Sequence, residues 1–271
     1  MPDSGRTLVL KFGGSAFAAD VLKPFAERVH AFHQGGDRVV VVHGGGKEIT
    51  NLLERLGKKS VFIDGLRVTD DETLDATEMV LSGRVNKALV RGLLAHGVRS
   101  VGIAGTDGAV LIAAPLVAER EDAQGRRFRI DYGHVGEVTE VHTELLETLL
   151  QAHYVPVVSP LALTTQGTTL NVNADTAAAR IAGALRAEAF LLLTDVPGVR
   201  VSQPGGAAVA AALTAAQVQA YKKDGTITGG MIPKVDACLD ALSRGAKTAR
   251  IASLDDFLTS PAPTGTVLTE T

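Results

Sequence analysis

Short runs of apolar, mostly β-branched residues alternate with longer amphipathic segments along the 271-residue chain. Strands that are apolar throughout are those buried on both faces, because a sheet with one solvated face alternates polar and apolar residues. The pattern therefore predicts an α/β fold with a mainly parallel central sheet between helices. We predict buried strands over Thr7–Phe12, Arg38–His43, Ser100–Ala104, Tyr154–Val158, Ala189–Thr194 and Thr248–Ala252.

The segments between these runs carry apolar residues at helical spacing, and the first of them ends at Gly35-Gly36. The highly charged segment Ala118–Asp131 indicates an exposed hairpin or loop. A stretch rich in Gly, Asn and Thr, Thr164–Asn173, is our candidate for the boundary between two lobes. We predict helices over Asp20–Phe32, Thr73–Leu94, His142–Ala152, Asp175–Leu185, Leu213–Tyr221 and Val235–Ser243.

The charge balance and the lone cysteine exclude several classes of protein. The 27 Lys and Arg and 30 Asp and Glu are interspersed, so no basic face suits nucleic acid. No apolar stretch approaches the ~18 residues of a membrane span. Met1 to Arg6 lack the features of a signal peptide, and Cys238 has no partner for a disulfide. We therefore expect a cytoplasmic protein whose partner is a small molecule.

Glycine-rich segments follow the first two predicted strands, at Gly13-Gly14 and at Gly44-Gly45-Gly46. Ligands of α/β sheets collect at the carboxyl ends of strands, and glycines let backbone amides approach a phosphate there. Gly46-Lys47 is followed by Glu48, which excludes a P-loop, and Ile49 stands where a dinucleotide-binding motif needs a third glycine. The alternative is a tight turn that binds nothing.

Two lysines lie where a charge needs a partner. Lys11 is one residue from the end of an apolar strand, where its desolvation costs several kcal/mol unless it meets an anion. Lys234 follows Gly229-Gly230 at the beginning of an apolar-striped helix. A structural ion pair is the alternative for Lys11, and a solvated helix lysine is the alternative for Lys234.

Further polar residues stand in a segment that would otherwise be apolar. Asn171 and Asn173 alternate along an extended segment, so both amides point toward one side. Asp175 follows at the beginning of a helix, where it would serve as an N-cap if it had no other role. Arg67 offers a planar fork suited to a carboxylate, and a surface salt bridge is the alternative for it.

Eight motifs occur in the order seen in the N-acetylglutamate kinases of the amino acid kinase family, which the chain resembles over nearly its whole length. They are Lys-Phe-Gly-Gly-Ser, Val-His-Gly-Gly-Gly, Gly-Leu-Arg-Val-Thr, Glu-Met-Val-Leu-Ser-Gly-Arg-Val-Asn-Lys, Gly-His-Val-Gly-Glu-Val, Leu-Asn-Val-Asn-Ala-Asp, Leu-Thr-Asp-Val-Pro-Gly-Val and Gly-Gly-Met-Ile-Pro-Lys.

The resemblance implies an open three-layer αβα sandwich that transfers phosphate from ATP to the side-chain carboxylate of N-acetyl-L-glutamate, the second step of arginine biosynthesis. It implies that residues 1–175 bind the acyl amino acid and form the dimer, and that residues 176–271 bind ATP. By similarity, Lys11 and Lys234 flank the transferred group and Asp175 orients both. Since the accepting carboxylate is ionised at neutral pH, with a pKa of ~4.3, no general base is needed.

The resemblance also assigns binding residues. Gly45, Gly46, Arg67, Asn171 and Asn173 are expected to bind the acyl amino acid, with Arg67 on its α-carboxylate. Gly13 and Gly14 are expected to bind phosphate. The nucleotide is expected to contact Asp195, Val196, Pro197, Gly198, Val199, Arg200, Thr226, Ile227 and Thr228. Mg²⁺ is expected on the ATP phosphates, with few or no protein carboxylates as direct ligands, because it retains waters readily.

The same resemblance predicts a homodimer formed through the helix Thr73–Leu94. Related enzymes that arginine inhibits carry an N-terminal helix that links dimers into hexamers, whereas Met1 to Arg6 are too short for one. We therefore expect little arginine feedback. A nitrogen-regulatory signal protein stays open as a partner, but no motif supports it.

Three alternatives remain. A kinase of carrier-protein-bound aminoadipate in lysine biosynthesis shares the fold, but the intact Gly65–Thr69 segment disfavours it. Carbamate, aspartate, glutamate and uridylate kinases fit the segments at residues 65–69 and 170–175 poorly. A non-catalytic regulatory subunit that binds an amino acid or a nucleotide would have lost Lys11, Lys234 or Asp175, and all three are present.

Overall fold

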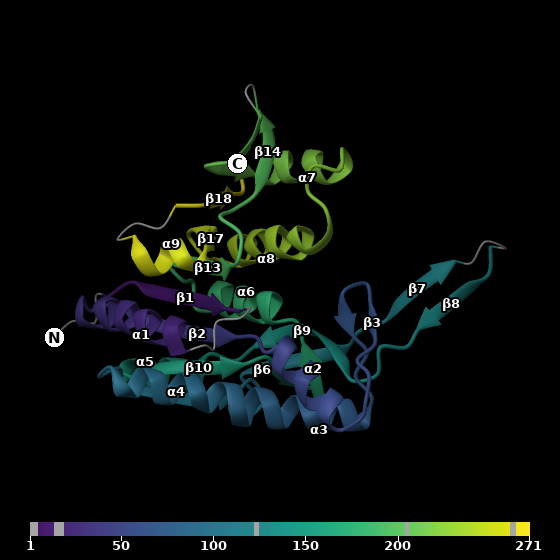
Figure 1. Cartoon of the computed structure of the whole chain (residues 1–271), viewed down its shortest axis with the longest axis horizontal. Helices are drawn as coiled ribbons and strands as arrows, with labels where there is room; N and C mark the ends of the chain where they lie inside the picture. Colours follow the sequence, from purple (N-terminus) through teal and green to yellow (C-terminus); the bar gives the residue numbers. More distant parts are fainter. Residues whose placement is uncertain (1–4, 14–18, 122–124, 204–205, 261–263) are drawn as a thin grey trace.

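A central sheet of eight strands organises the computed structural model, which describes residues 5–13, 19–121, 125–203, 206–260 and 264–271 (Figure 1). Across the sheet the strands follow the order β16, β18, β17, β13, β1, β2, β10, β5, and each neighbouring pair is parallel except β17 and β18. Their bounds are β1 Thr7–Phe12, β2 Arg38–His43, β5 Ser100–Ala104, β10 Val155–Ser159, β13 Ala189–Thr194, β16 Ala212–Thr214, β17 Ala249–Ser253 and β18 Thr266–Thr269. All six predicted strands are confirmed, with shifts of one residue in β10 and β17.

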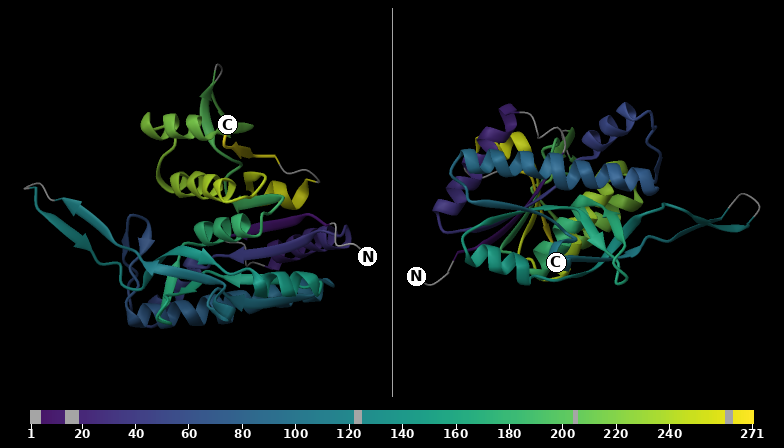
Figure 2. Two further views of the ribbon diagram at one scale, coloured as in Figure 1. Left: turned by 180° about the vertical axis from the view of Figure 1, so that it is seen from behind. Right: turned by 90° about the horizontal axis from the view of Figure 1, so that it is seen from below.

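Helices cover both faces of this sheet (Figure 2, right). One face carries α1 (Ala19–Gln34), α4 (Asn86–Ala95) and α9 (Leu254–Thr259), and the other carries α5 (Glu144–Gln151), α6 (Ala174–Ala184) and α8 (Ile232–Ser243). In β1, Leu8 and Leu10 pack into the core under α1, whereas Val9 packs into the core under α6 and α8. Because side chains alternate along a strand, Lys11 lies on the α6 and α8 side with Val9.

The helix predicted over Thr73–Leu94 is confirmed as one continuous helical stretch with a π-helical turn in its middle. It consists of α3 (Asp71–Glu78), the π turn (Met79–Val85) and α4. The predicted start of the helix at Leu213 is wrong, because Leu213 lies in β16. Helix α7 (Ala215–Lys223) begins later because Thr214 forms a capping box with Gln217. The other helical segments are α2 (Gly46–Arg55) and the 3-10 turns Asp107–Ala109 and Gly229–Met231.

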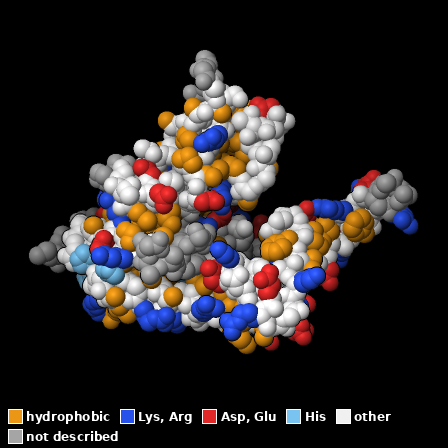
Figure 3. All heavy atoms as spheres, in the orientation of Figure 1, with side chains coloured by type: hydrophobic (Ala, Val, Ile, Leu, Met, Phe, Trp, Pro, Cys, Tyr) orange, Lys and Arg blue, Asp and Glu red, His pale blue; other side chains and the backbone are white. Residues whose placement is uncertain are grey.

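Short strands that the sequence analysis did not predict form a small closed barrel and two hairpins. The barrel contains β6 (Leu111–Pro115), β9 (Val135–Val141), β11 (Leu161–Leu163) and β12 (Thr169–Val172). The hairpins pair β3 (Phe62–Ile63) with β4 (Leu66–Arg67), and β14 (Arg200–Gln203) with β15 (Gly206–Val209). The hairpin predicted within Ala118–Asp131 is confirmed as β7 (Ala118–Glu121) and β8 (Arg127–Ile130), and it projects away from the central sheet (Figures 1, 2 and 3).

The predicted division into residues 1–175 and 176–271 falls in the first turn of α6. The two parts share the central sheet, since β1 pairs with β13 in parallel. Assignment of separate binding roles to the two parts stays a prediction. No helix in the described ranges is long and apolar enough to cross a membrane.

Candidate active site

The carboxyl ends of β1 and β2 meet at one edge of the sheet, as the sequence analysis expects. Phe12 pairs with His43 in register, so Gly13 and Gly44 follow neighbouring strands at the same level. A Cβ atom at Gly13 would collide with the ammonium group of Lys11, so a larger residue there would require that group to move. Gly14 lies outside the described residues.

Lys11 and Lys234 share the carboxylate of Asp175. Lys11 Nζ lies 2.7 Å from Asp175 Oδ1, and Lys234 Nζ lies 2.9 Å from Oδ2. The three side chains come from β1, α8 and the first turn of α6, and their exposed fractions are 10%, 21% and 8% for Lys11, Lys234 and Asp175. Two ammonium groups face one carboxylate here, so this buried cluster carries a net charge of +1.

The alternative in which Asp175 is the N-cap of α6 is wrong. The N-cap is Asn173, whose side-chain oxygen accepts hydrogen bonds from the backbone N–H groups of Asp175 (2.8 Å) and Thr176 (3.1 Å). Because Asn173 caps the helix, the carboxylate of Asp175 is available to the two lysines. Burial alone would raise the pKa of Asp175, but the attraction and hydrogen bonds of Lys11 and Lys234 outweigh it and lower the pKa.

A cavity of about 220 Å³ lies at the same edge of the sheet. This is below the ~300 Å³ at which pockets for drug-sized ligands begin, so a small metabolite suits it. Gly45 closes one wall against the π turn, because a Cβ atom there would lie 2.6 Å from Leu81 Cδ2. Most residues that line the cavity belong to the glycine segment after β2, to the β3–β4 hairpin or to the chain that leads into α6. The lining residues are Gly44, Gly45, Gly46, Ile49, Phe62, Gly65, Leu66, Arg67, Leu81, Val135, Pro160, Asn171, Val172, Asn173 and Ala174.

Arg67 is buried in the wall of this cavity, so the surface salt bridge considered for it is wrong. Its guanidinium donates to Gly46 O at 2.7 Å, to Thr50 Oγ1 at 2.8 Å and to Ser60 Oγ. It also lies 4.7 Å from the centre of the Phe62 ring. Burial lowers the pKa of Arg67 below its ordinary value, yet the group stays charged at neutral pH. Among the described residues it has no carboxylate partner, so a carboxylate from a ligand would complete its site.

Asn171 and Asn173 both line the cavity, as their alternate spacing predicts. Asn171 Nδ2 donates to Thr69 Oγ1 at 3.2 Å, and Thr69 in turn donates to Arg67 O at 2.9 Å. Asn173 uses its oxygen as the helix cap, so its NH₂ group is the part that can serve a ligand. The two residues thereby connect the cavity to both Arg67 and the helix that carries Asp175.

His43 and Asn86 support the glycine segment after β2, and neither was predicted from the sequence. His43 Nδ1 lies 2.9 Å from Gly44 O, and Asn86 Nδ2 lies 3.2 Å from His43 Nε2. Burial is the main cause that lowers the pKa of His43 to about 4, so the imidazole is neutral at pH 7. Asn86 could have been identified from its place on the helix: it lies three residues before Leu89 and seven before Leu93, so a polar residue stands on the apolar stripe.

The residues expected to bind the nucleotide follow β13 or precede α8. Asp195, Pro197 and Arg200 are exposed and Val196 is half-buried, whereas Val199 is buried and its N–H donates to Thr266 Oγ1 at 2.8 Å. Gly198 packs so closely that a Cβ atom would lie 2.7 Å from Thr266 Oγ1. Thr226 and Thr228 flank Ile227, whose side chain is in the core. The contribution of Val199 and Ile227 to nucleotide binding would therefore be to shape the site.

Within the described ranges, no group of three His, Cys, Asp or Glu side chains is arranged to hold a metal ion. The cations at the site are instead the two ammonium groups around Asp175 and the Arg67 guanidinium. These groups suit anionic oxygens such as those of phosphate and carboxylate groups.

Comparison with known proteins supports the same interpretation. The chain matches the profile of the Amino acid kinase family over residues 6–253. It is 45% identical over 249 residues to an acetylglutamate kinase of Geobacter sulfurreducens, a match that covers 92% of this chain and 84% of that protein.

Solved structures with the same fold include the smu.665 protein of Streptococcus mutans, with a TM-score of 0.80, 30% identity and complete coverage of both chains. The carbamate kinase of Giardia lamblia has a TM-score of 0.66 at 17% identity and covers 99% of this chain and all of its own, which shows the fold alone. These findings confirm the resemblance and the predicted fold class. The chain belongs to the amino acid kinase family.

Proposed function

We propose that this chain transfers the terminal phosphoryl group of ATP to the side-chain carboxylate of N-acetyl-L-glutamate, the second step of arginine biosynthesis. The observation that carries the proposal is the pair of lysines that share the buried carboxylate of Asp175 beside a small cavity. A net positive charge in a place with little water is suited to the oxygens of a phosphoryl group. The names of curated relatives at 42–45% identity supply the substrate.

The reaction needs no proton transfer. An oxygen of the substrate carboxylate forms a bond to the terminal phosphorus, the bond from that phosphorus to the bridging oxygen breaks, and its electrons leave with ADP. The carboxylate is ionised at neutral pH, with a pKa of ~4.3, so the neutral His43 is not required as a base. Catalysis then depends on positioning and on charge stabilisation.

We assign a separate role in positioning or charge stabilisation to each group of residues. We assign Lys11 and Lys234 to the oxygens of the transferred group and of the leaving ADP, and Asp175 to the orientation of both lysines. Backbone amides of Gly13, Gly14, Gly45 and Gly46 would hold phosphate and acyl oxygens. Arg67 would bind the substrate α-carboxylate, while Asn171 and Asn173 would fix the rest of the substrate.

The nucleotide would lie along Asp195–Arg200 and Thr226–Thr228, near the start of α8. Mg²⁺ bound to the ATP phosphates would neutralise part of their charge, and the described residues would contact the phosphates rather than the ion. Closure of the N-terminal part over the C-terminal part would exclude water from the acyl phosphate product.

We further assign this protein to the cytoplasm as a homodimer. The continuous helical stretch from Asp71 to Ala95 exposes Met79 and Leu94, with 66% and 52% of their surfaces accessible. Exposed large apolar side chains on one long helix suit a contact with a second copy. A dimer mass by light scattering, lost on Met79→Glu substitution, would support this assignment, and a monomer mass for the wild type would overturn it.

The central test is ADP release by the purified protein with Mg-ATP. N-acetyl-L-glutamate would be compared with glutamate, aspartate, N-acetyl-aminoadipate and carbamate, and Lys11→Ala would be the blank. We expect selective activity on N-acetyl-L-glutamate that the substitution abolishes. Binding of ATP without activity on any of these free compounds would overturn the proposal in favour of a carrier-bound substrate.

A further inference from the structure

The β3–β4 hairpin forms one wall of the cavity and carries Phe62, Leu66 and Arg67. Its turn is Asp64-Gly65, and both residues have positive φ, 53° and 78°, as a two-residue type I′ turn requires. Each strand has two residues, and so short a hairpin is not stable by itself. Contacts from outside the hairpin must therefore hold Arg67 at the cavity.

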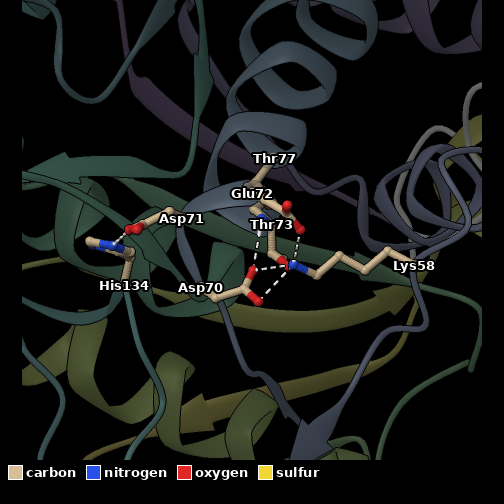
Figure 4. A network of polar contacts seen from close by, with 7 residues as sticks. All are labelled: Lys58, Asp70, Asp71, Glu72, Thr73, Thr77 and His134. Atoms are coloured by element: carbon tan, nitrogen blue, oxygen red, sulfur yellow. Dashed lines mark hydrogen bonds and ion pairs between the residues drawn. The ribbon is translucent and has the colours of Figure 1, made fainter.

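Contacts at the base of the hairpin fix the chain on either side of it. Lys58, before β3, donates to both Asp70 carboxylate oxygens at 2.7 and 2.6 Å and to Glu72 at 2.7 Å (Figure 4). Between these anchors, Val68 N–H donates to Val61 O at 2.9 Å. These contacts hold the base, and the hydrogen bonds of the Arg67 guanidinium to Gly46 O, Thr50 Oγ1 and Ser60 Oγ hold the end of that side chain. The backbone of the turn is held by other contacts.

The turn itself is held through the carboxylate of Asp64. Tyr132 Oη donates to Asp64 Oδ2 at 2.9 Å, and the Arg120 guanidinium donates to Oδ1. Tyr132 is 3% exposed, and its carbonyl accepts a hydrogen bond from Thr69 N–H at 2.9 Å. One buried residue therefore contacts both the turn and the chain that leaves the hairpin.

We propose that Asp64 is a positioning residue for the amino-acid substrate, which acts by holding the β3–β4 hairpin, and with it Arg67, against Tyr132 and Arg120. The inference rests on the proposed function, in which Arg67 binds the substrate carboxylate. Asp64 touches no reacting atom in this assignment. Without the Asp64 carboxylate, the hairpin would occupy a wider range of positions, and Arg67 would face the cavity in a smaller fraction of molecules.

The ion pair of Asp64 with Arg120 and its hydrogen bond with Tyr132 differ in strength. Arg120 and Asp64 are 52% and 45% exposed, and exposed ion pairs contribute little. The Tyr132 hydroxyl donates from a buried residue to a charged oxygen, which is a stronger interaction. Loss of hydration, together with the neighbouring Asp64 charge, raises the pKa of Tyr132, so the phenol is a proton donor at neutral pH. Tyr132 is therefore the main anchor.

The test compares steady-state constants of Asp64→Asn, Tyr132→Phe and Arg120→Gln. Asparagine tolerates positive φ, so Asp64→Asn keeps the turn and removes the charge. We expect Tyr132→Phe and Asp64→Asn to raise KM for N-acetylglutamate about 3- to 10-fold, and Arg120→Gln to raise it about twofold. The kcat and the KM for ATP should stay within about twofold of the wild type. When Asp64→Asn and Tyr132→Phe are combined, their effects on KM for N-acetylglutamate should be less than additive.

Glu119→Gln is the matched control, because Glu119 pairs with Arg129 (3.6 Å) on the same β7–β8 hairpin. It should leave every constant unchanged. Unchanged KM in both Asp64→Asn and Tyr132→Phe would overturn the inference. A parallel change in kcat and in both KM values would also overturn it, because that is the pattern of a general loss of structure.

Amide hydrogen exchange of residues 61–68 without substrate separates this inference from the proposed function. We expect faster exchange in Asp64→Asn and Tyr132→Phe, and wild-type exchange in Glu119→Gln. Faster exchange in a protein that does not phosphorylate N-acetylglutamate would overturn the proposed function and leave the restraint of the hairpin standing. Wild-type exchange in an active enzyme would overturn the restraint alone.

Discussion

Lysine and carboxylate groups meet at nearly equal distances in two clusters of this chain, but in very different surroundings. In the cluster at the end of β1, the two lysines lie 2.7 and 2.9 Å from Asp175. The side chains of Lys11 and Asp175 are 10% and 8% exposed, and that of Lys234 is 21% exposed. Here two positive charges share one negative charge.

The second cluster lies at the beginning of α3 (Figure 4). Lys58 lies 2.6 Å from Asp70 and 2.7 Å from Glu72, and the exposed fractions of the three side chains are 27%, 60% and 83%. Here two negative charges share one positive charge. Water completes the solvation of the excess charge, so no ligand is needed.

The comparison shows that burial, rather than distance, separates a site from a surface contact. At 4 Å two unit charges interact with about 1 kcal/mol in water and with about 4 kcal/mol at an effective dielectric constant of ~20, the value that describes even buried sites in proteins. An unbalanced charge in the buried cluster therefore attracts an anionic ligand strongly. The same imbalance at the surface is screened by water and salt.

The sharpest test of this difference removes the shared carboxylate of the buried cluster. Asp175→Asn leaves two buried ammonium groups without a counter-charge, which we expect to lower the free energy of unfolding by about 3–5 kcal/mol and to abolish measurable turnover. Urea unfolding and ADP release would measure both effects. If Asp175→Asn were as stable and as active as the wild type, the buried cluster would have neither of its assigned roles.

The same carboxylate makes stability depend on pH. The pKa of Asp175 is lowered in the folded state, so its contribution is present above the ordinary value of 3.8 and is lost as pH falls through the lowered pKa. We expect Asp175→Asn to weaken the pH dependence of unfolding at acidic pH. If the free energy of unfolding of the variant changed with pH as steeply as that of the wild type, the assigned ion pairs would be contradicted.

The next largest effect comes from neutralising one lysine at a time. Lys11→Met or Lys234→Met leaves Asp175 with one lysine, so stability should fall less than in Asp175→Asn. The kcat should fall by roughly 10²-fold or more, if each lysine contributes about 3 kcal/mol to the transition state. Lys58→Met is the matched control in the exposed cluster, and its kcat should equal that of the wild type. Equal losses of kcat in Lys58→Met and Lys11→Met would remove the distinction between the clusters.

Arg67 extends the comparison to a buried cation without a carboxylate among the described residues. We expect Arg67→Ala to raise KM for the acetylated amino acid by about 10- to 100-fold, the equivalent of about 1.5–3 kcal/mol for a hydrogen-bonded charge. The KM for ATP should change little. An unchanged KM for the amino acid would show that Arg67 does not bind its carboxylate.

The sequence predicted much of this site because unusual residue placement carries a local signal. Lys11 is a charge at the end of an apolar strand, and that position alone implied a buried partner. The same local reasoning offered a helix cap for Asp175 and a surface salt bridge for Arg67. Both alternatives were wrong, because Asn173 takes the cap and the Arg67 side chain is buried among hydroxyl groups and a backbone carbonyl.

The parts that escaped prediction depend on contacts between distant segments. The barrel strands β11 and β12 have three and four residues, too few for a clear periodic pattern. The π turn that places Leu81 against Gly45 has no sequence signal separate from that of an ordinary helix. His43 and Asn86 are 43 residues apart, so their pairing appears only when β2 and α4 pack together.

Substitution of Asp70 in the exposed cluster is expected to have the smallest effect on the free energy of unfolding, and it tests that cluster most directly. Asp70 has two roles, because it pairs with Lys58 and accepts the N-cap hydrogen bond from Thr73 N–H at 2.9 Å. Asparagine is also a good N-cap, so Asp70→Asn removes the ion pair and keeps the cap, whereas Asp70→Ala removes both. We expect Asp70→Ala to lower the free energy of unfolding by about 1 kcal/mol, and Asp70→Asn to lower it by about half of that or less.

The hydrogen bond from Lys58 is the main cause that lowers the pKa of Asp70 to about 2. The contribution of this carboxylate is therefore present above its ordinary pKa of 3.8 and is lost as pH falls toward 2. Since the side chain is 60% exposed, solvent screening keeps that contribution small, and the unfolding profiles of wild type and Asp70→Asn should nearly coincide between pH 4 and 7. If Asp70→Asn cost as much stability as Asp175→Asn, equal distances would mean equal energies, and burial would no longer explain why one cluster is a site and the other a surface contact.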